Sequence, residues 1–466
     1  MKAFTLNSKN LGKFVIATPV TVTSITENMK FYNRETEIAL LGKIGELSKS
    51  TAQMTFVVGR RRIGKTSLLV KAYPQHNCVY LFVAKKSEAL LCAEFAEEIM
   101  QKLEVPLFGA LKTFKEVFGF LMEISKSQHF TVIIDEFQEF NSINSSIYSD
   151  MQHLWDAAKQ DSKLNLILCG SVYSMMTRIF ENSKEPLFGR ATQRLVVKPF
   201  DIATLQEILK DCSPNFKNED LLAFYLLTGG VAKYVELLVQ AEAFNLEAML
   251  DTLLSENSFF LEEGKNVLIE EFGKDYGNYF SILSLIASGK TARTEIESIL
   301  EIQTGGFLDR LENDYALIKK IRPLMAKPGG RSVKYRINDN FLNFWFRFLF
   351  KYRSAVEIRN LDYVKQIISR DYATYSGPIL EKFFLDKFIA EKKYNQLGTY
   401  WKKGNLDEID IVAINDLEKK VVFVEVKRSK KNISIPKLQE KSKALQQELI
   451  GYNFEFLGLS IEDMTK

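Results

Sequence analysis

The chain has 466 residues, of which 46% are hydrophobic and 26% are charged. At roughly 150 residues per domain this length predicts about three domains, and the ordinary composition excludes a disordered or fibrous protein. The formal net charge of +4 is mildly basic, which permits contact with nucleic acid without indicating it.

The cysteines, histidines and apolar runs argue against several other classes of protein. The four cysteines are isolated and the three histidines have no paired ligands, which favours core thiols in a reduced compartment over disulfides or zinc. No uninterrupted apolar run approaches the roughly 20 residues that cross a bilayer, and the N-terminus lacks the pattern of a signal peptide. We therefore expect a cytoplasmic protein with no membrane partner.

Residues 54–200, within an expected core domain of residues 1–200, alternate short apolar runs with helical stretches, which is the pattern of a parallel sheet covered by helices. The apolar residues of each run are mostly consecutive and do not alternate with polar ones, as in strands that are buried on both faces. The expected strands are residues 54–58, 78–83, 131–134, 164–168 and 195–197. This pattern predicts a P-loop α/β core.

Helical periodicity dominates residues 201–275, which predicts a helical lid. Residues 276–360 are expected to form three short helices, a hairpin with its tip at residues 327–331 and an aromatic helix, which together indicate a winged helix. The third helix, residues 304–313, either enters a DNA major groove or, because it is poorly basic, packs on the core. A final α/β domain is expected over residues 361–466.

Residues 59–66 match the GxxxxGK[ST] pattern between an expected strand and a helical run. The glycines of this pattern let backbone N–H groups surround phosphates at a helix N-terminus. Lys65 is expected to reach the β and γ phosphates of ATP, and the Thr66 hydroxyl to bind Mg²⁺. The expected nucleotide contacts are Gly59, Arg60, Arg61, Arg62, Ile63, Gly64, Lys65, Thr66 and Ser67.

A second motif supports the same site. Residues 132–136 read as a buried strand that ends in two carboxylates, with Asp135 expected beside Mg²⁺ and Glu136 expected to polarise the attacking water. The alternative is a strand that ends in a solvated acidic turn. Ser171 follows the next expected strand, so it is either a sensor of the γ-phosphate or part of a plain turn. The two motifs together predict an ATPase.

Several arginines near this site have more than one interpretation. Arg60, Arg61 and Arg62 could face DNA, a partner subunit or acidic residues of the lid, and a solvated or ion-paired role is favoured. Arg190 could neutralise transition-state charge in its own or a neighbouring subunit, which would involve a homo-oligomer. The alternative is a surface arginine that pairs with acids.

Residues 31–37, 59–66, 134–138 and 186–190 resemble the corresponding motifs of the archaeal-type AAA ATPases. The resemblance covers nearly the whole chain and implies a P-loop core, a helical lid, a winged helix and a C-terminal restriction-endonuclease-like domain. Residues 229–232 read Gly-Gly-Val-Ala, whereas the lid motif of that family usually ends in proline. The adenine contact implied by the family motif is therefore not assigned to these residues.

Charged residues interrupt two apolar strands of the final domain. Glu425 and Lys427 are two residues apart on one strand and share a face, and Asp410 lies on the adjoining strand. Asp410 and Glu425 are expected to hold Mg²⁺, while Lys427 orients or deprotonates water for attack on a phosphodiester. The pattern resembles the PD-(D/E)xK nucleases, which implies that Glu381, on an expected helix over residues 378–390, is their helical acid. The alternative is a solvated strand face.

These features indicate an ATP-driven enzyme or switch that acts on DNA through a nuclease-like domain. Two other hypotheses stay open at this point. One is a signalling ATPase whose C-terminal domain only binds a partner, and the other is a nucleotide-dependent assembly scaffold.

Overall fold

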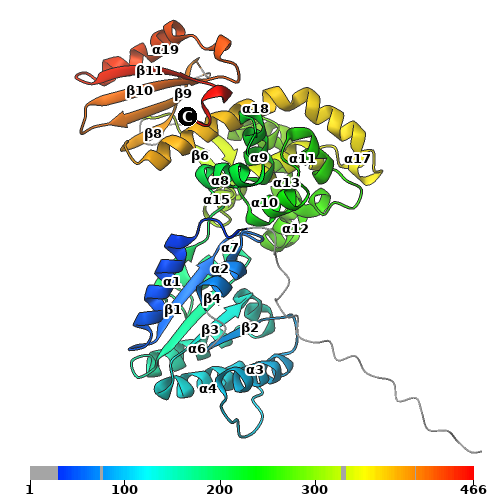
Figure 1. Cartoon of the computed structure of the whole chain (residues 1–466), viewed down its shortest axis with the longest axis vertical. Helices are drawn as coiled ribbons and strands as arrows, with labels where there is room; N and C mark the ends of the chain where they lie inside the picture. The colour runs from blue at the N-terminus through cyan, green and yellow to red at the C-terminus, as the bar shows by residue number, and fades with distance from the viewer. Residues whose placement is uncertain (1–29, 74–76, 327–331, 403, 405) are drawn as a thin grey trace, which may run out of the picture. The chain divides into compact units, whose positions relative to one another are not determined.

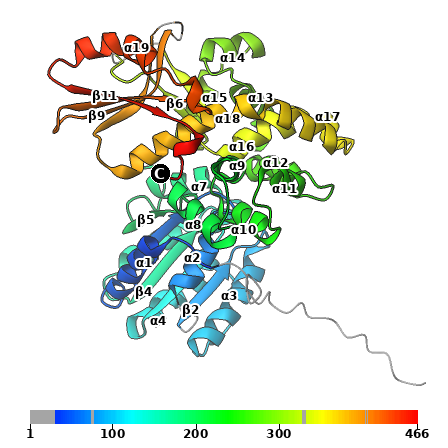
Figure 2. The ribbon, with the colours of Figure 1, turned by 45° about the horizontal axis from the view of Figure 1, so that its top comes forward.

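The computed structural model describes residues 30–73, 77–326, 332–402, 404 and 406–466. It divides into two units, residues 1–31 and residues 32–466, and the features below belong to the second unit. Figures 1 and 2 show the elements of this unit in two views. In the part of the chain that is described, no helix combines the length and apolar character needed to cross a membrane.

A five-stranded parallel sheet in the order β2-β3-β4-β1-β5 forms the core of the N-terminal half. The strands are β1 (Gln53–Val58), β2 (Cys78–Phe82), β3 (Phe130–Asp135), β4 (Leu164–Cys169) and β5 (Gln193–Val196). Both β3 and β4 are buried along their whole length, as expected for strands covered on both faces. The predicted P-loop α/β core is therefore confirmed.

Helices cover the two faces of this sheet (Figure 1). Met54, Phe56 and Val58 of β1 point into one apolar core. The helices that share this core are α3 (Glu88–Leu103), α4 (Phe114–Ser127), α6 (Ile147–Ala158) and α7 (Tyr173–Glu181). On the opposite face, Asn165 of β4 lies near Gly45 of α1 (Glu35–Leu47), which contacts α2 (Lys65–Ala72). Alternate residues of each strand therefore serve different layers of helices.

Helix α4 illustrates how the sequence produces this layer. Thr113 and Glu116 form a reciprocal capping box, which satisfies backbone N–H groups that the first helical turn leaves unpaired. Phe114, Phe118 and Leu121 recur at helical spacing and are fully buried against the sheet. Capping and apolar periodicity therefore agree on the start and the orientation of this helix.

The segment after β5 is helical, as expected from its periodicity. Its helices are α8 (Ile202–Cys212), α9 (Asn218–Thr228), α10 (Ala232–Gln240), α11 (Leu246–Leu253) and α12 (Phe260–Phe272). Every residue from Leu221 to Thr228 in α9 is buried, so this helix is covered on all sides. Helices α8, α10, α11 and α16 (Asn340–Phe344) all contact it.

Three helices and a two-stranded antiparallel sheet follow. They are α13 (Tyr276–Ala287), α14 (Arg293–Leu300), α15 (Gly305–Asn313), β6 (Ile318–Ile321) and β7 (Lys334–Ile337). The expected tip of the hairpin, residues 327–331, lies outside the described residues. The aromatic segment continues from α16 into a π-helical turn, Trp345–Phe350, and the short helix α17 (Arg353–Glu357).

The C-terminal region has a four-stranded sheet in the order β11-β10-β9-β8. Its elements are α18 (Leu361–Glu391), β8 (Gln396–Lys402), β9 (Leu406–Asn415), β10 (Lys420–Val426), α19 (Ile435–Glu448) and β11 (Asn453–Leu459). Strands β8, β9 and β10 pair in antiparallel fashion, whereas β10 and β11 are parallel and are joined through α19. Leu438 and Leu445 of α19 pack on this sheet.

Helix α18 is longer than its sequence suggests. A proline commonly begins a helix, and the expected helix starts at Pro378, but α18 runs through that residue from Leu361. A proline inside a helix removes one hydrogen bond and costs about 3 kcal/mol or more. Ser376, Ile379 and Leu380 are buried around the proline, so tertiary packing on both sides offsets the local cost.

Substitutions at two helical glycines, Gly264 in α12 and Gly277 in α13, can test the packing of α12. A Cβ added at Gly264 would collide with the ring of Trp345, which is buried and donates a hydrogen bond to Leu261 O at 3.0 Å. Gly264→Ala should therefore destabilise the protein by about 1–3 kcal/mol, the usual cost of overpacking. Thermal unfolding followed by circular dichroism measures the change.

Gly277→Ala is the matched control, because a Cβ at this position in α13 meets nothing within 4 Å. This variant should be neutral or gain up to ~1 kcal/mol from helix propensity. Equal melting temperatures for the two variants would contradict the packing account.

Candidate functional site

Two glycines shape the loop between β1 and α2. Gly64 has φ of 92°, in the left-handed region that glycine adopts without strain. A side chain at Gly59 would approach the carbonyl oxygen of Val197 to 2.8 Å, so only glycine fits there. The loop thereby leads directly into the N-terminus of α2, whose unpaired N–H groups form an anion site.

The predicted lysine and threonine lie in the first turn of α2, where Ser67 also lies. Lys65 is buried, and its Nζ donates to the carbonyl oxygens of Gly59 at 2.7 Å and Arg60 at 3.1 Å. The Thr66 hydroxyl donates to Asp135 Oδ2 at 3.2 Å. The structure therefore brings the glycine-rich loop and the acidic end of β3 together, as required for a shared nucleotide and metal site.

Asp135 also contacts a tyrosine that the sequence motifs did not reveal. Tyr80 of β2 donates its hydroxyl to Asp135 Oδ2 at 2.5 Å, while the N–H of Glu136 donates to Oδ1 at 2.9 Å. Burial, followed by the charge of Asp135, raises the pKa of Tyr80, so the tyrosine stays a neutral donor. Only the pairing of β2 with β3 identifies this tyrosine, because 55 residues separate it from the aspartate.

Glu136 is held by two side-chain donors. Its backbone is left-handed, with φ of 53°, an uncommon conformation that turns the chain sharply at the end of β3. Its Oε2 accepts hydrogen bonds from Ser171 Oγ at 2.7 Å and from Gln138 Nε2 at 2.5 Å. The structure thus places Ser171 against the carboxylate expected to polarise water, and adds the buried Gln138, which the sequence analysis missed.

The arginines of the loop meet acidic residues in three places. Arg62 Nε lies 2.7 Å from Oε1 of Glu263, a fully buried residue of α12, and its guanidinium stacks 4.5 Å from the ring centroid of Phe259. Tyr234 also donates to Glu263 Oε1, at 2.8 Å. Burial raises the pKa of Glu263, while the tyrosine and the arginine oppose this shift.

The other two arginines reach further elements. Arg60 Nη1 lies 3.1 Å from Oδ2 of Asp339, the N-cap residue of α16, and its Nη2 donates to Ala316 O at 2.9 Å. Arg61 Nη1 lies 3.6 Å from Glu270 Oε2 on α12. Each loop arginine therefore has a carboxylate partner in the region after the core.

Arg190 lies in a different setting. Its Nη2 is 3.1 Å from Asp156 Oδ2 of α6, and its Nη1 donates to the carbonyl oxygen of Phe188 at 2.9 Å. Arg190 is partly exposed and paired with a surface acid of its own chain. The structure does not bring it to the loop residues through any contact among the described residues.

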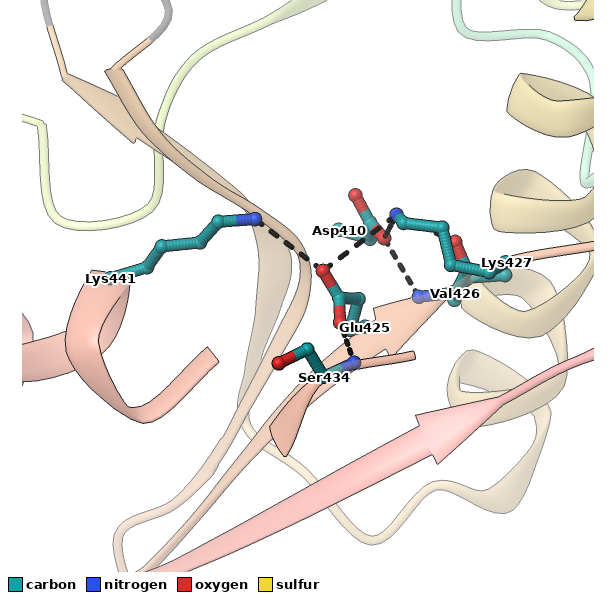
Figure 3. A network of polar contacts seen from close by, with 6 residues as sticks. All are labelled: Asp410, Glu425, Val426, Lys427, Ser434 and Lys441. Atoms are coloured by element: carbon teal, nitrogen blue, oxygen red, sulfur yellow. Dashed lines mark hydrogen bonds and ion pairs between the residues drawn. The ribbon is translucent and has the colours of Figure 1, made fainter. Parts of the chain in front are cut away.

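Figure 3 shows the second group of predicted residues, which lies at the C-terminal sheet. Asp410 Oδ2 accepts hydrogen bonds from the Val426 N–H at 2.7 Å and from Lys427 Nζ at 3.2 Å. Lys427 Nζ also lies 3.9 Å from Glu425 Oε1. The lysine therefore stands between the two carboxylates, which the pairing of β9 with β10 brings together.

Glu425 is buried, and elements beyond β10 hold it in place. Its Oε2 accepts the Ser434 N–H at 2.9 Å, and its Oε1 lies 3.5 Å from Lys441 Nζ on α19 (Figure 3). Two lysines thus balance the two carboxylates. The sequence pattern did not identify Lys441, because α19 must fold back over the sheet before the contact exists.

Glu381 lines a cavity of about 440 Å³ together with Asp410, Arg336 and Trp401. Burial, with the charge of Asp410 adding to it, raises the pKa of Glu381 to about 7. Within the described residues, no group of three or more His, Cys, Asp or Glu side chains is arranged to hold a metal ion. Glu381 therefore shares a cavity with Asp410 without joining a three-residue ligand cluster.

The sheet order, the glycine loop at an anion-binding helix and the acidic strand end define a P-loop ATPase. Residues 31–238 match the family model described as an ATPase domain predominantly from Archaea. Residues 345–443 match a family of archaeal and bacterial proteins of unknown function. These matches confirm the predicted resemblance to the archaeal-type AAA ATPases.

Two further comparisons agree with this resemblance. An uncharacterized protein of Methanocaldococcus jannaschii is 29% identical over 406 residues, which are 85% of this chain and 87% of that protein. The fold is similar to that of a Walker-type ATPase of Pyrococcus abyssi, with a TM-score of 0.52 and 18% identity, over 68% of this chain and 96% of that one.

Substitutions of Lys65 and Glu136 should separate binding from hydrolysis. Lys65→Ala removes a buried charge that is expected to bind phosphate, so ATP affinity should fall about 10- to 100-fold. Glu136→Gln keeps the shape and loses the basic carboxylate, so ATP should still bind while turnover falls about 100-fold or more. Equilibrium titration with ATP and a phosphate-release assay measure the two effects. Unchanged turnover in Glu136→Gln would contradict the role of this carboxylate.

The raised pKa of Glu381 predicts a pH-dependent effect on stability. The unfolded chain ionises this carboxyl at its ordinary pKa, whereas the folded protein disfavours the charge up to about pH 7. The wild type should therefore lose stability relative to Glu381→Gln as pH rises through this window. Urea unfolding at about pH 5 and about pH 8 measures the change in this difference.

Glu455→Gln on β11 is the control for this experiment, because Glu455 pairs with Lys420 at a surface position of the C-terminal sheet. A stability difference between Glu381→Gln and the wild type that stays constant across pH would show that the fold does not disfavour the charge.

Proposed function

We propose that this chain is a magnesium-dependent ATPase that acts on DNA through a C-terminal nuclease-like domain. The observation that carries the proposal is one polar group, formed by Asp410 and Glu425 on neighbouring strands and by Lys427 directly after β10. We further propose domain boundaries at residues 1–200 for the core, 201–275 for the lid, 276–360 for the winged helix and aromatic helix, and 361–466 for the nuclease-like domain.

The oxygen atoms at the P-loop suit a magnesium ion. Thr66 and Asp135 supply hard oxygen ligands 3.2 Å apart beside the N-terminus of α2. Bound Mg²⁺ would neutralise phosphate charge. Lys65 would bind the phosphates, and Glu136, held by Ser171, would orient and polarise the attacking water.

The C-terminal group suits metal-assisted cleavage of a phosphodiester. Asp410 and Glu425 offer two carboxylates, the number that protein sites commonly provide to Mg²⁺ while water completes its shell. Such an ion would polarise the phosphate and activate water. Lys427, which lies between the acids, would orient that water, and Glu381 would add negative charge beside Asp410 once ionised.

The charge around this group favours a polyanionic substrate. Residues 427–443 contain seven basic side chains and the single acid Glu440. Lys430, Lys431, Lys437 and Lys443 are exposed there. A cluster of exposed cations next to paired carboxylates is suited to holding nucleic-acid phosphates near a metal site.

Contacts of α15 favour packing over entry into a DNA groove for the proposed winged helix. Arg310 Nη1 donates to Tyr279 OH at 3.4 Å, and Glu312 Oε1 accepts the Lys320 N–H at 3.1 Å. These polar side chains are engaged by α13 and β6. The C-terminal basic segment is thus the better candidate for DNA contact.

Removal of one carboxylate should abolish cleavage and spare ATP hydrolysis. The wild type should cut duplex, single-stranded or branched DNA with Mg²⁺ or Mn²⁺, in the presence or absence of ATP. Asp410→Ala and Glu425→Ala should each lose this cutting, because one carboxylate cannot hold the ion as two do. Gel assays of DNA cleavage and phosphate release measure the two activities.

Glu455→Ala, a substitution on β11 of the same sheet, should cut DNA like the wild type. If the wild type binds DNA but cuts none of these substrates, and Asp410→Ala binds equally well, the domain is a docking module. That result would reject the nuclease.

A further inference from the structure

A second cavity, of about 790 Å³, lies beside the P-loop. Gly59 and Ile63 of the loop form one part of its wall, and Phe200 and Val231 extend this wall with apolar surface. The volume falls within the range of small-molecule sites, which are mostly apolar with a few placed polar groups. Because the loop that holds phosphates also lines this cavity, a nucleotide bound at the loop could extend into it.

The opposite wall is supplied by α18, far along the chain from the ATPase core. Lys382 and Asp386 line the cavity and lie one helical turn apart. Lys382 Nζ donates to Tyr225 OH at 2.8 Å and to Asp386 Oδ2 at 3.0 Å, and Tyr225 OH donates to the same carboxylate oxygen at 2.7 Å. This closed group holds an ammonium and a carboxylate at the cavity wall.

We propose that the cavity binds the base and ribose of the nucleotide, and that Lys382 and Asp386 are the residues of α18 that contact this nucleoside. The proposal rests on nucleotide binding at the P-loop. A carboxylate accepts hydrogen bonds from ribose hydroxyls, and the apolar wall accommodates a flat base. An ammonium has three donors, and the two bonds to Tyr225 and Asp386 use two of them.

The proposal also supplies a nucleoside contact that the lid motif does not provide. Residues 229–232 lack the usual proline, yet Gly229 and Val231 line the same cavity. Arg60 lines it as well and pairs with Asp339 at 3.1 Å, on the side of α16. The C-terminal helix is therefore part of the nucleotide site.

Neighbouring residues of α18 line the two cavities. Glu381 lines the cavity that contains Asp410, whereas Lys382 lines the cavity at the P-loop. A nucleoside that contacts Lys382 would restrain α18 at the position next to the C-terminal acidic site. The two sites would share one rigid element.

The test compares ATP with inorganic tripolyphosphate, which has the phosphates but no nucleoside. Isothermal titration of the full chain should give a Kd for ATP about tenfold higher in Lys382→Met and in Asp386→Asn, because each loses a charge-assisted contact. The Kd for tripolyphosphate should stay within about twofold of the wild type. Lys382→Met keeps the aliphatic stem of the side chain and so protects the packing of α18.

Two further variants serve as controls. Lys65→Ala should weaken both ligands, since it acts on the phosphates. Lys365→Met, also on α18 but paired with Asp251 at 2.8 Å on the surface, should change neither. ATP binding at wild-type strength in both Lys382→Met and Asp386→Asn would overturn the proposal, as would an equal loss of both ligands.

The same titrations separate this proposal from the one on which it rests. A wild type that binds tripolyphosphate and ATP equally well retains a phosphate site but has no nucleoside contact, which overturns only the role of α18. A wild type that binds neither ligand overturns the nucleotide site itself, and the role of α18 with it.

Discussion

The buried carboxylate of Glu263 constrains how the ATPase core joins the rest of the chain. A charge removed from water is tolerated only when partners compensate for its lost hydration. Arg62 and Tyr234 supply these partners at 2.7 Å and 2.8 Å. Because Arg62 belongs to the P-loop, a movement of this loop that separates it from α12 would leave an unpaired charge in the interior. The phosphate-binding loop and the helices that follow the core are therefore mechanically linked.

The geometry of the sheet explains why the predicted catalytic groups meet. Parallel strands end at one edge, so residues that follow β1, β3 and β4 converge there. Asp135, Glu136 and Ser171 come from two of these strand ends, and Thr66 comes from the helix after the third. Tyr80 joins them from the next strand outward, where its neutral hydroxyl fixes the orientation of Asp135.

Helix α18 extends this linkage to the C-terminal sheet. The helix continues through Pro378, and the residues after the proline face both cavities. At the C-terminal sheet, two lysines hold the carboxylates of Asp410 and Glu425. A metal ion would take over part of this charge neutralisation, so binding of the ion and displacement of lysine contacts would be coupled there.

The sequence by itself determined the P-loop, the acidic end of β3 and the Glu425-x-Lys427 pair, because their chemistry needs residue types at short, regular spacing. The alternating strands and helices likewise determined the class of the core. Only the tertiary structure decided the partners of Arg62 and the contact of Tyr80 with Asp135, since both depend on strand order and helix packing between distant segments. It also decided the length of α18, where burial on both sides of Pro378 outweighs the local preference of proline to begin a helix.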